Sequence, residues 1–490
     1  MSLDEAAAVV RRLRGAGHEA YLVGGCVRDM LRGAMPEDFD IVTSARPEQV
    51  RTLFARTVPI GARFGVVLVV EKGRTYEVAA FRSETDYVDG RRPSRVAYAT
   101  AEEDVRRRDF TVNGLLMDPE TGRVIDYVDG RRDIEGRLIR TIGDPMERFA
   151  EDHLRMIRAV RFTAVLDYAI DPATLAAIRR QAPGVRRISA ERIREELRRI
   201  ITSRGARKGM ELLAESGLLA EILPEVLALR GVAQPAGFHP EGDVWEHTLR
   251  MLALLPDVDG GAPPRRKALE APSPEGRPGD LSGHPGPPAE HPRGGLAGSE
   301  TPVPSAERNR SCLAWAVLLH DIGKAVTRSE DESGIHFYGH VQRGGEIAAA
   351  ILRRLRFSLE ETETILALVR GHMLFMDVQK MRPSRLKRFL RQPDFPLHLE
   401  LHRLDCLASH GLLDHHRFCL GKLEAYSGAE LRPAPLLTGK DLIRMGYRPG
   451  PLFREILLAL EEAQLNGEVT DAEEARRLVQ RGWGGRDGNT

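Results

Sequence analysis

The hydrophobic periodicity of the chain changes once, near residue 142, and this change restricts the possible folds more than any other feature. Before it, short apolar runs typical of strands alternate with helical segments, as at Ala20–Val23 and in the hairpin pattern of 66–71 and 75–81. After it, apolar residues recur at intervals of three and four, beginning with FAEDHLRMIRAVRFTAVL. The sequence therefore predicts an α+β protein, with a small α/β head followed by an all-helical remainder.

Composition shifts divide the chain further. Pro, Gly, Ser and charged residues dominate 257–309, which holds too few large apolar side chains to fold and is predicted to be a disordered insert. The polar residues 82–99 predict a loop, and a capping box at Thr100 and Glu103 predicts a helix that continues to about Met117. Four regions result, namely a head (1–142), a helical neck (143–230), a second helical domain that contains the insert (231–425) and a helical tail (426–490).

Length and composition exclude several classes of protein. A chain of 490 residues predicts two to four domains. No apolar run reaches the roughly 18 residues of a membrane span, and the N-terminus lacks the apolar core of a secretory signal. The four cysteines form no CxxC pair, so they are expected to be reduced thiols in a cytoplasmic protein.

Charge is unevenly distributed along the chain. The net charge is only +1, yet residues 178–208 hold eleven Lys or Arg against three Glu, a local charge of +8. A solvated helix face and an RNA-binding surface both explain such a run, and only a nucleic-acid-related site elsewhere would favour the second.

Two motifs near the N-terminus indicate phosphate chemistry. Asp38 and Asp40 are two residues apart beside a predicted strand, and paired carboxylates of this kind can hold Mg²⁺ together with substrate phosphates. Gly24 and Gly25 lie between a predicted strand and helix, where exposed backbone N–H groups approach phosphates closely. Each motif alone is common, but the two in this order and spacing are specific.

These motifs and three more resemble those of the class II tRNA nucleotidyltransferase and bacterial poly(A) polymerase family. The matching segments are LVGGCVRD (22–29), DFD (38–40), RRDFTVN (107–113), EDHLR (151–155) and ISAERI with EEL (188–197). The resemblance implies template-independent transfer of CMP and AMP from CTP and ATP to the 3′ end of tRNA, with Mg²⁺ as cofactor. It also favours the basic segment 178–208 as an RNA surface.

The resemblance implies a role for each matching residue: Asp38 and Asp40 as catalytic Mg²⁺ ligands, Gly24, Gly25 and Arg28 at the triphosphate, Arg108, Asp109 and Asn113 at the ribose, and Asp152 with Arg155 at the base. Arg158 and Arg161 would meet phosphates or solvent. Ordinary alternatives stay open from the residues alone. Asp109 could form an ion pair with Arg107 or Arg108, and Asp152 an i,i+3 salt bridge with Arg155. Glu77 could be a third carboxylate near the metal or a partner of Arg82.

A second set of residues, in the order H…HD…H…H…D, resembles the metal ligands of the HD phosphohydrolase superfamily. Its members are His247, His320, Asp321, His340, His372 and Asp405. Imidazole with carboxylate suits Mn, Fe, Ni, Co or Zn ions, which can generate a bound hydroxide for phosphate-ester cleavage. The insert makes His247 the least secure ligand, His336 competes with His340, and Lys324 could bind a phosphate or be solvated.

The product is harder to predict than the reaction. Poly(A) polymerases of the family carry two basic residues after the Gly of the segment 59–64, where this chain has Ala62 and Arg63, and they carry a long basic tail that is missing here. Both departures favour tRNA as substrate, with CC-only and A-only addition as further alternatives. The competing hypotheses are a phosphohydrolase with an RNA-binding head and, less well supported, a non-catalytic RNA-binding protein.

Overall fold

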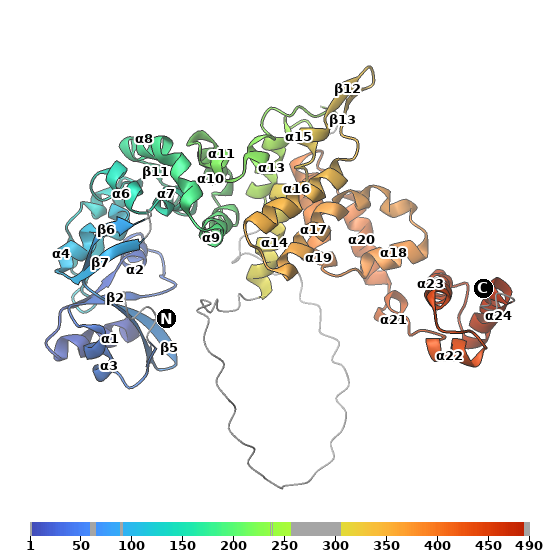
Figure 1. The fold of residues 1–490 in the computed structure, drawn as a ribbon, viewed down its shortest axis with the longest axis horizontal. Helices are drawn as coiled ribbons and strands as arrows, with labels where there is room; N and C mark the ends of the chain where they lie inside the picture. The colour runs from blue at the N-terminus through green and yellow to red at the C-terminus, as the bar shows by residue number, and fades with distance from the viewer. Residues whose placement is uncertain are drawn as a thin grey trace, which may run out of the picture.

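The computed structural model describes residues 2–58, 65–88, 92–235, 237, 239–255 and 305–484, with the backbone alone described for 84–88 and 92–96. Figure 1 shows an elongated molecule with the head and the tail at opposite ends and the second helical domain between them. The predicted insert lies almost entirely outside the described residues. Its last five residues, however, belong to helix α14 (Ser305–Leu319), so the helix begins earlier than the sequence pattern indicated.

A mixed seven-stranded sheet forms the head, in the order β3-β4-β5-β2-β1-β8-β9. The predicted hairpin is present, because β4 (Val66–Glu71) pairs antiparallel with β5 (Arg74–Ala80). β2 (Asp40–Thr43) lies between β5 and β1 (Ala20–Val23), parallel to the first and antiparallel to the second. The remaining strands are β3 (Thr57–Val58), β8 (Leu115–Met117) and β9 (Val124–Asp126).

Helices cover the sheet and give it a core. α1 (Leu3–Gly15) begins at a capping box in which Glu5 donates its N–H to the Ser2 hydroxyl, as the sequence predicted. Its buried residues Val9, Val10 and Leu13 pack in one cluster with Leu22 and other side chains of the sheet. α3 (Pro47–Leu53) contributes Val50 to the same cluster, which continues without a break into the neck and the second helical domain.

Two local predictions in the head were wrong. Residues 82–99 form an antiparallel strand pair, β6 (Arg82–Val88) and β7 (Arg92–Tyr98), because cross-strand pairing supplies the backbone hydrogen bonds that a polar composition alone does not forecast. α4 (Ala101–Arg106) begins at the predicted Thr100 capping box but ends eleven residues before Met117. The chain instead forms a 3₁₀ turn, η2 (Thr111–Asn113), and then β8.

The neck is helical, with a break at Asp152 and one short strand that pairs with the end of the head. α6 (Pro145–Glu151) and α7 (Leu154–Leu166) are separate helices, because the backbone at Asp152 leaves the helical region. The two-residue strands β10 (Leu138–Ile139) and β11 (Ala169–Ile170) pair in parallel, a contact too short to leave a sequence pattern. The other neck helices are α8 (Pro172–Gln181), η3 (Ala182–Arg187), α9 (Ala190–Ile201), α10 (Ala206–Glu215), α11 (Leu218–Ile222) and α12 (Pro224–Leu227).

The second helical domain packs around α14, nine residues of which are buried. Against α14 lie α13 (Val244–Ala253), α17 (Leu359–Gly371) and α19 (Phe395–Ala408). A short hairpin, β12 (Ser329–Asp331) with β13 (Gly334–His336), projects from the domain and adds a second departure from an all-helical remainder (Figure 1). The other elements are α15 (Lys324–Thr327), α16 (His340–Arg354), η4 (His372–Lys380), α18 (Pro383–Leu390) and α20 (Asp414–Ala425).

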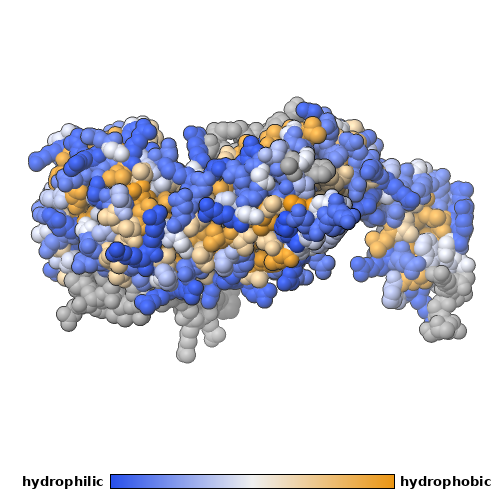
Figure 2. Space-filling view, turned by 90° about the horizontal axis from the view of Figure 1, so that it is seen from above, coloured by the Kyte–Doolittle hydropathy of each residue, from blue (hydrophilic) through white to orange (hydrophobic). Residues whose placement is uncertain are grey.

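The tail has its own small core. α22 (Gly439–Arg444), α23 (Pro451–Asn466) and α24 (Ala472–Trp483) bury Leu442, Ile456 and Val479 in a cluster separate from the main core. In Figure 2 hydrophilic residues cover much of the visible face, and the tail stands apart from the rest. Among the described residues, no helix is long and apolar enough to span a bilayer.

Candidate functional site

The head places three carboxylates around the start of β2, near the middle of its sheet. Asp40 is the first residue of β2, Asp38 lies two residues before it outside the strand, and Glu77 is on the neighbouring strand β5. In the parallel β2–β5 register Ile41 is paired with Val78, so Asp40 and Glu77, one residue earlier on each strand, lie side by side. Desolvation by the surrounding protein, followed by the negative charge of Glu77, raises the pKa of Asp40 to about 6. A divalent cation would relieve the repulsion that Asp40 meets from its carboxylate neighbours, so the position suits such an ion.

The glycine turn lies beside this cluster between two guanidinium groups. Gly24 ends β1 and starts α2 (Gly25–Leu31) with φ 78°, a conformation that favours glycine. A Cβ at Gly24 would lie 3.6 Å from Nη1 of Arg108, and one at Gly25 would lie 3.6 Å from Nη2 of Arg28. Arg108 also lowers the pKa of Asp40, which places its charge near the carboxylates. The turn therefore joins a backbone surface without side chains to two guanidinium groups, which suits a polyphosphate. Each is also in an ion pair, Arg28 with Asp29 and Arg108 with Asp104.

The ion pairs around Asp109 differ from the alternative that the sequence left open. Arg107 and Arg108 both pair with Asp104, which is fully buried, at 2.6 and 3.0 Å. Asp109 is itself buried and pairs with Arg158 at 2.6 Å. Asn113 and the Phe110 N–H donate to its other oxygen. Burial alone would raise the pKa of Asp109, but Arg158 lowers it to about 2, so the side chain is a fixed, ionised hydrogen-bond acceptor.

Asp152 and Arg155 have different partners from those expected. The break between α6 and α7 places Asp152 between the helices, where it accepts a hydrogen bond from Arg192 of α9 at 2.8 Å. Arg155 pairs with Glu151 at 2.5 Å and donates to the backbone carbonyls of Arg148 and Arg107. The predicted shared helix face is therefore wrong in detail, because the chain is not helical at Asp152.

Arg161 is buried and Arg158 is half-buried, so neither forms the solvated basic face that the sequence left open. Arg161 lies 3.2 Å from the buried Glu196 of α9, and its pKa falls to about 10 because burial disfavours the charge. The guanidinium groups of Arg28, Arg158 and Arg161 all approach the ring of Phe162, at 5.5, 5.4 and 4.3 Å from its centroid. Of these cation–π contacts, the one from Arg28 joins α2 of the head to α7 of the neck, and the other two lie within α7.

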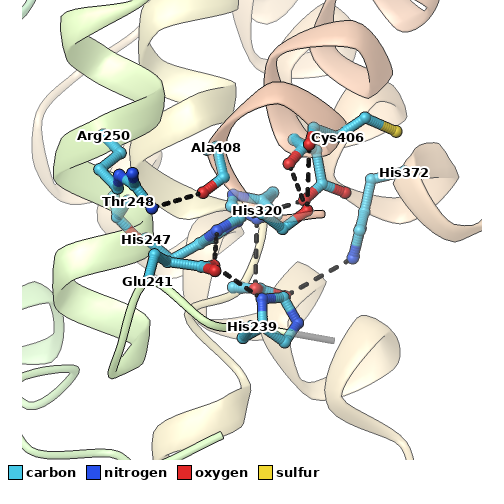
Figure 3. A network of polar contacts seen from close by, with 12 residues as sticks. His239, Glu241, His247, Thr248, Arg250, His320, His372, Cys406 and Ala408 are labelled. Carbon is cyan, nitrogen blue, oxygen red and sulfur yellow. Dashed lines mark hydrogen bonds and ion pairs between the residues drawn. The ribbon is translucent and has the colours of Figure 1, made fainter. Parts of the chain in front are cut away.

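In the second helical domain the structure brings the six predicted ligands together from distant parts of the chain. Figure 3 labels three of them, His247, His320 and His372. His320 and Asp321 follow α14, His340 begins α16 and His372 follows α17. Nδ1 of each of these histidines lies 2.7–3.0 Å from a backbone carbonyl, those of Val317, Phe337 and Val369. The fourth ring, that of His247, has Nδ1 2.7 Å from Glu241 Oε1. All four rings are thereby fixed in the tautomer that leaves Nε2 free as a ligand atom.

The opposite nitrogens converge on the carboxylates without hydrogen bonds. Nε2 of His247, His320, His340 and His372 and Oδ1 of Asp321 are buried atoms with no hydrogen-bond partner. The His247 nitrogen lies 3.2 Å from Asp405, and those of His340 and His372 lie 3.8 and 3.7 Å from Asp321, but not in hydrogen-bond geometry. Buried orphan atoms in such number need an ion or water.

The six ligands form two groups whose atoms all lie within 4.8 Å of one another, His247 with His320 and Asp405, and Asp321 with His340 and His372. A third group of this kind joins His247 to Glu241 and His239. Nitrogen and carboxylate donors of this kind fit one or two transition-metal ions. Nearby Asp405 and Glu241 overcome burial and raise the pKa of His247 to about 9, so this ring must release a proton when it binds an ion. Burial and His320 lower the pKa of His372 to about 4, so that ring is a neutral ligand.

Three sequence-based uncertainties about this site are decided by its geometry. His247 lies fully buried within the cluster despite the insert that follows α13. His336 is in the projecting hairpin, where it pairs with Asp331, and does not compete with His340. Lys324 is buried and donates to Asp321 at 2.7 Å, so it lies in the site and not in solvent.

Three family models match separate parts of the chain. Residues 20–140 match the model of the poly(A) polymerase head domain, residues 167–229 that of a probable RNA- and SrmB-binding site of polymerase A, and residues 289–401 that of the HD domain. The head and the neck are therefore similar to the corresponding parts of poly(A) polymerases. The HD match begins after His247 and ends before Asp405, so the structure extends that centre by one ligand at each end.

Family relatives include two proteins described as CCA-adding enzymes. The Geobacillus stearothermophilus protein is 46% identical over 218 residues, which cover 44% of this chain and 54% of the relative. The Bacillus licheniformis protein is 40% identical over 255 residues, 51% of this chain and 64% of the relative. The chain thus spans about half to two thirds of the curated relatives that it matches. A solved Bacillus stearothermophilus CCA-adding enzyme in complex with CTP aligns over 98% of both chains, with a TM-score of 0.68 and 27% identity.

Several residues of both sites were missed from the sequence alone. Glu241 and His239 carry no family motif, and nothing in their spacing from His247 identifies a carboxylate shared by two imidazoles. Arg192 and Glu196 lie within the neck motif, but only the tertiary fold reveals that they pair with Asp152 and Arg161.

Proposed function

We propose that this chain adds CMP and AMP from CTP and ATP to the 3′ end of tRNA without a template, as CCA addition or repair. The observation that carries the proposal is the glycine turn between Arg28 and Arg108, beside carboxylates from two adjacent strands. The printed description of a full-length structural relative, a CCA-adding enzyme in complex with CTP, supports it. The four regions with the boundaries given above, and a cytoplasmic location for a chain whose cysteines are all free, are parts of the same proposal.

In this mechanism Asp38 and Asp40, with Glu77 beside them, hold Mg²⁺, which would activate the attacking 3′-OH and neutralise the leaving pyrophosphate. Arg28 and Arg108 bind the triphosphate over the Gly24–Gly25 backbone. Asp109 accepts a hydrogen bond from the ribose 2′-OH, for which its ionised and oriented carboxylate is suited. Asp152 accepts and Arg155 donates at the base edge, and Arg192 and Glu151 hold these two side chains in place.

Extension of synthetic tRNAs that end in the discriminator base, in C and in CC tests the product. With CTP and ATP in Mg²⁺, the expected result is ordered addition of C, C and a single A. Long A-tracts would instead indicate a poly(A) polymerase, and arrest after CC, or addition of A alone to the CC-ended tRNA, a CC-only or A-only enzyme. The 59–64 segment that separates these activities by sequence lies outside the described residues.

The residue assignment has its own test. The double variant Asp38→Ala/Asp40→Ala is expected to abolish nucleotide addition, whereas Glu37→Ala, at an exposed neighbouring carboxylate, should leave it unchanged. Addition that survives the double substitution contradicts the assignment.

We also propose that the HD centre is a transition-metal-dependent phosphohydrolase, with Mn, Fe, Ni, Co or Zn as the candidate ions. The buried orphan nitrogens of four histidines favour it. Asp321→Asn should remove metal-dependent phosphatase activity and leave nucleotide addition intact, and the head double variant should do the reverse. If the head variant retained every activity of the protein, the chain would be chiefly a phosphohydrolase with an RNA-binding head.

A further inference from the structure

Helix α9 of the neck holds groups of the proposed nucleotide site along one of its faces. Arg192 donates from Nη2 to Oδ2 of Asp152 at 2.8 Å. Glu196, four residues later, lies 3.2 Å from Arg161 and 3.9 Å from Arg158. Arg158 in turn pairs with the carboxylate proposed for the ribose. Because residues four apart share a side of a helix, this face of α9 supports both the base-reading and the ribose-reading groups.

The opposite face of α9 contacts the HD domain. Arg194 and Arg198 are also four residues apart, and each follows the preceding pair by two residues, about 200° around the helix. Arg194 donates to the carbonyl of Arg356, and its guanidinium lies 5.3 Å from the centre of the Phe357 ring. Arg198 donates to Oε1 of Glu307, on α14, at 2.6 Å. Figure 1 shows α9 beside α14, where the neck meets the HD domain.

These contacts lead to the helix whose end carries the histidine–aspartate pair of the metal centre. Phe357 packs edge to face against Trp315 of α14, with ring centres 5.2 Å apart, and Trp315 is fully buried. Arg310, also on α14, donates to the carbonyl of Thr202 at the end of α9, 2.5 Å away. α14 therefore supports α9 directly at two points and through Phe357 at a third.

The core between these two faces leaves α9 little freedom to shift. Its residues Ile193, Leu197 and Ile200 are buried in the cluster that continues from the head into the HD domain. A close-packed interior transmits a displacement and does not absorb it, so a movement of α9 on one side changes its contacts on the other. The contacts that fix α9 on the HD side therefore also fix Arg192 and Glu196.

We propose that the HD domain, through Arg194 and Arg198, positions the base-reading and ribose-reading groups of the nucleotidyltransferase site. The inference rests on the proposed nucleotide addition and deepens it, since a domain with its own metal centre would set the accuracy with which the head selects base and sugar. Arg194, Arg198 and Glu307 are positioning residues, because they act through α9 and lie outside the nucleotide-binding groups assigned above.

The expected effect of loosening these contacts is on selectivity and not on the chemical step. The carboxylates proposed for Mg²⁺ and the glycine turn belong to strands and a helix of the head, so a small shift of α9 leaves them in place and moves Asp152 and Asp109 instead. Cytosine presents an amino donor where uracil presents an acceptor, and a carboxylate can accept only from the first. A misplaced Asp152 therefore discriminates poorly between CTP and UTP, and a misplaced Asp109 between CTP and dCTP.

The test uses the full-length protein and a tRNA that ends in the discriminator base, with kcat and KM measured for CTP, UTP and dCTP. Glu307→Arg sets two guanidinium groups against each other where α14 meets α9. We expect the kcat/KM of CTP relative to UTP, and relative to dCTP, to fall about tenfold, because one well-placed hydrogen bond distinguishes each pair of nucleotides. The kcat for CTP should stay close to that of the wild type.

A reversed pair and a matched control separate positioning from a general structural effect. Arg198→Glu added to Glu307→Arg re-forms the pair with its charges exchanged and should restore both ratios, since Glu195 keeps Arg199 as a partner at 2.7 Å. Glu360→Arg breaks the neighbouring ion pair of α14, which joins Arg308 to α17 within the HD domain, and should leave both ratios unchanged.

Arg194→Met removes the second contact and should lower the ratios as Glu307→Arg does, so the conclusion does not depend on one variant. Wild-type ratios in both variants, with wild-type circular dichroism, would overturn the positioning role and leave nucleotide addition intact. An equal loss in Glu360→Arg would also overturn it, because the effect would then not depend on α9. Failure of the wild-type protein to extend tRNA at all would instead overturn the proposed function, and with it this inference, so the two failures are distinguishable.

Discussion

Replacement of Arg158 by Met tests whether the ion pair with Asp109 holds the head and the neck together. Asp109 follows α4 of the head, Arg158 is on α7 of the neck, and the pair is 2.6 Å long with an Asp109 side chain only 10% exposed. The pKa of Asp109 falls from 3.8 to about 2. This difference corresponds to about 2–3 kcal/mol of stability at neutral pH. Methionine fills much of the volume of Arg158 but leaves a buried carboxylate without its main partner, so we expect a loss of that size.

The tryptophans of the chain allow the affected region to be followed separately. All three, Trp245, Trp315 and Trp483, lie in the HD domain and the tail, and none in the head or the early neck. In urea unfolding of Arg158→Met, the midpoint measured by circular dichroism should therefore fall for the head and neck. The midpoint measured by tryptophan fluorescence should change little. Because the protein has several domains, the two signals are fitted separately and not to a single two-state model.

A matched control and a double-mutant cycle isolate the interaction. Arg106→Met removes an exposed i,i+4 pair with Glu102 on α4 and should cost at most about 0.5 kcal/mol. In Asp109→Asn/Arg158→Met the buried charge is gone, so the double variant should be more stable than the sum of the single losses predicts. If Arg158→Met were no more destabilising than Arg106→Met, the stabilising role of the pair would be refuted.

Three further predictions follow from other contacts. The Asp109 contribution is fully present above a pH of about 4 and is lost as the pH falls through about 2, so the stability difference between wild type and Asp109→Asn should shrink over that window; a constant difference would contradict the assignment. Gly205→Ala would place a Cβ 2.1 Å from the Ala164 carbonyl and should destabilise the neck by about 1–3 kcal/mol in chemical unfolding, whereas Gly15→Ala, with nothing within 4 Å, should not. Glu241→Gln should weaken Mn²⁺ binding about tenfold or more in calorimetric titrations, because it perturbs the orientation of His247, and Asp331→Asn beside the remote His336 should leave the affinity unchanged.

The sequence by itself determined the features that depend on local order. The change of periodicity near residue 142 separates a sheet-containing head from a mainly helical remainder because period two and period three to four are properties of neighbouring residues. The same holds for the capping boxes at Ser2 and Thr100, for the 66–81 hairpin and for the glycine turn that opens α2. The motif order also sufficed to identify the family, since its defining segments are short and contiguous.

Only the tertiary structure decided which partners the charged residues choose. Arg107 and Arg108 turn to Asp104 and leave Asp109 to Arg158, 49 residues away, because burial makes every carboxylate compete for the nearest guanidinium and the fold sets the distances. The break at Asp152 similarly depends on contacts beyond the helical pattern, in particular with Arg192. The strand pair of 82–98 had no strong periodic pattern, and the two-residue strands had none.

The HD centre shows the division most clearly. Its six predicted ligands were recognised from the kinds and order of residues, but their convergence requires that α13, α14, α16, α17 and α19 pack together, and these helices span more than 150 residues of sequence. Glu241 and His239 could not be found in advance, because an orienting group is defined by what surrounds it in space. The sequence specified the chemistry available to the centre, and long-range packing decided which atoms remain free to use it.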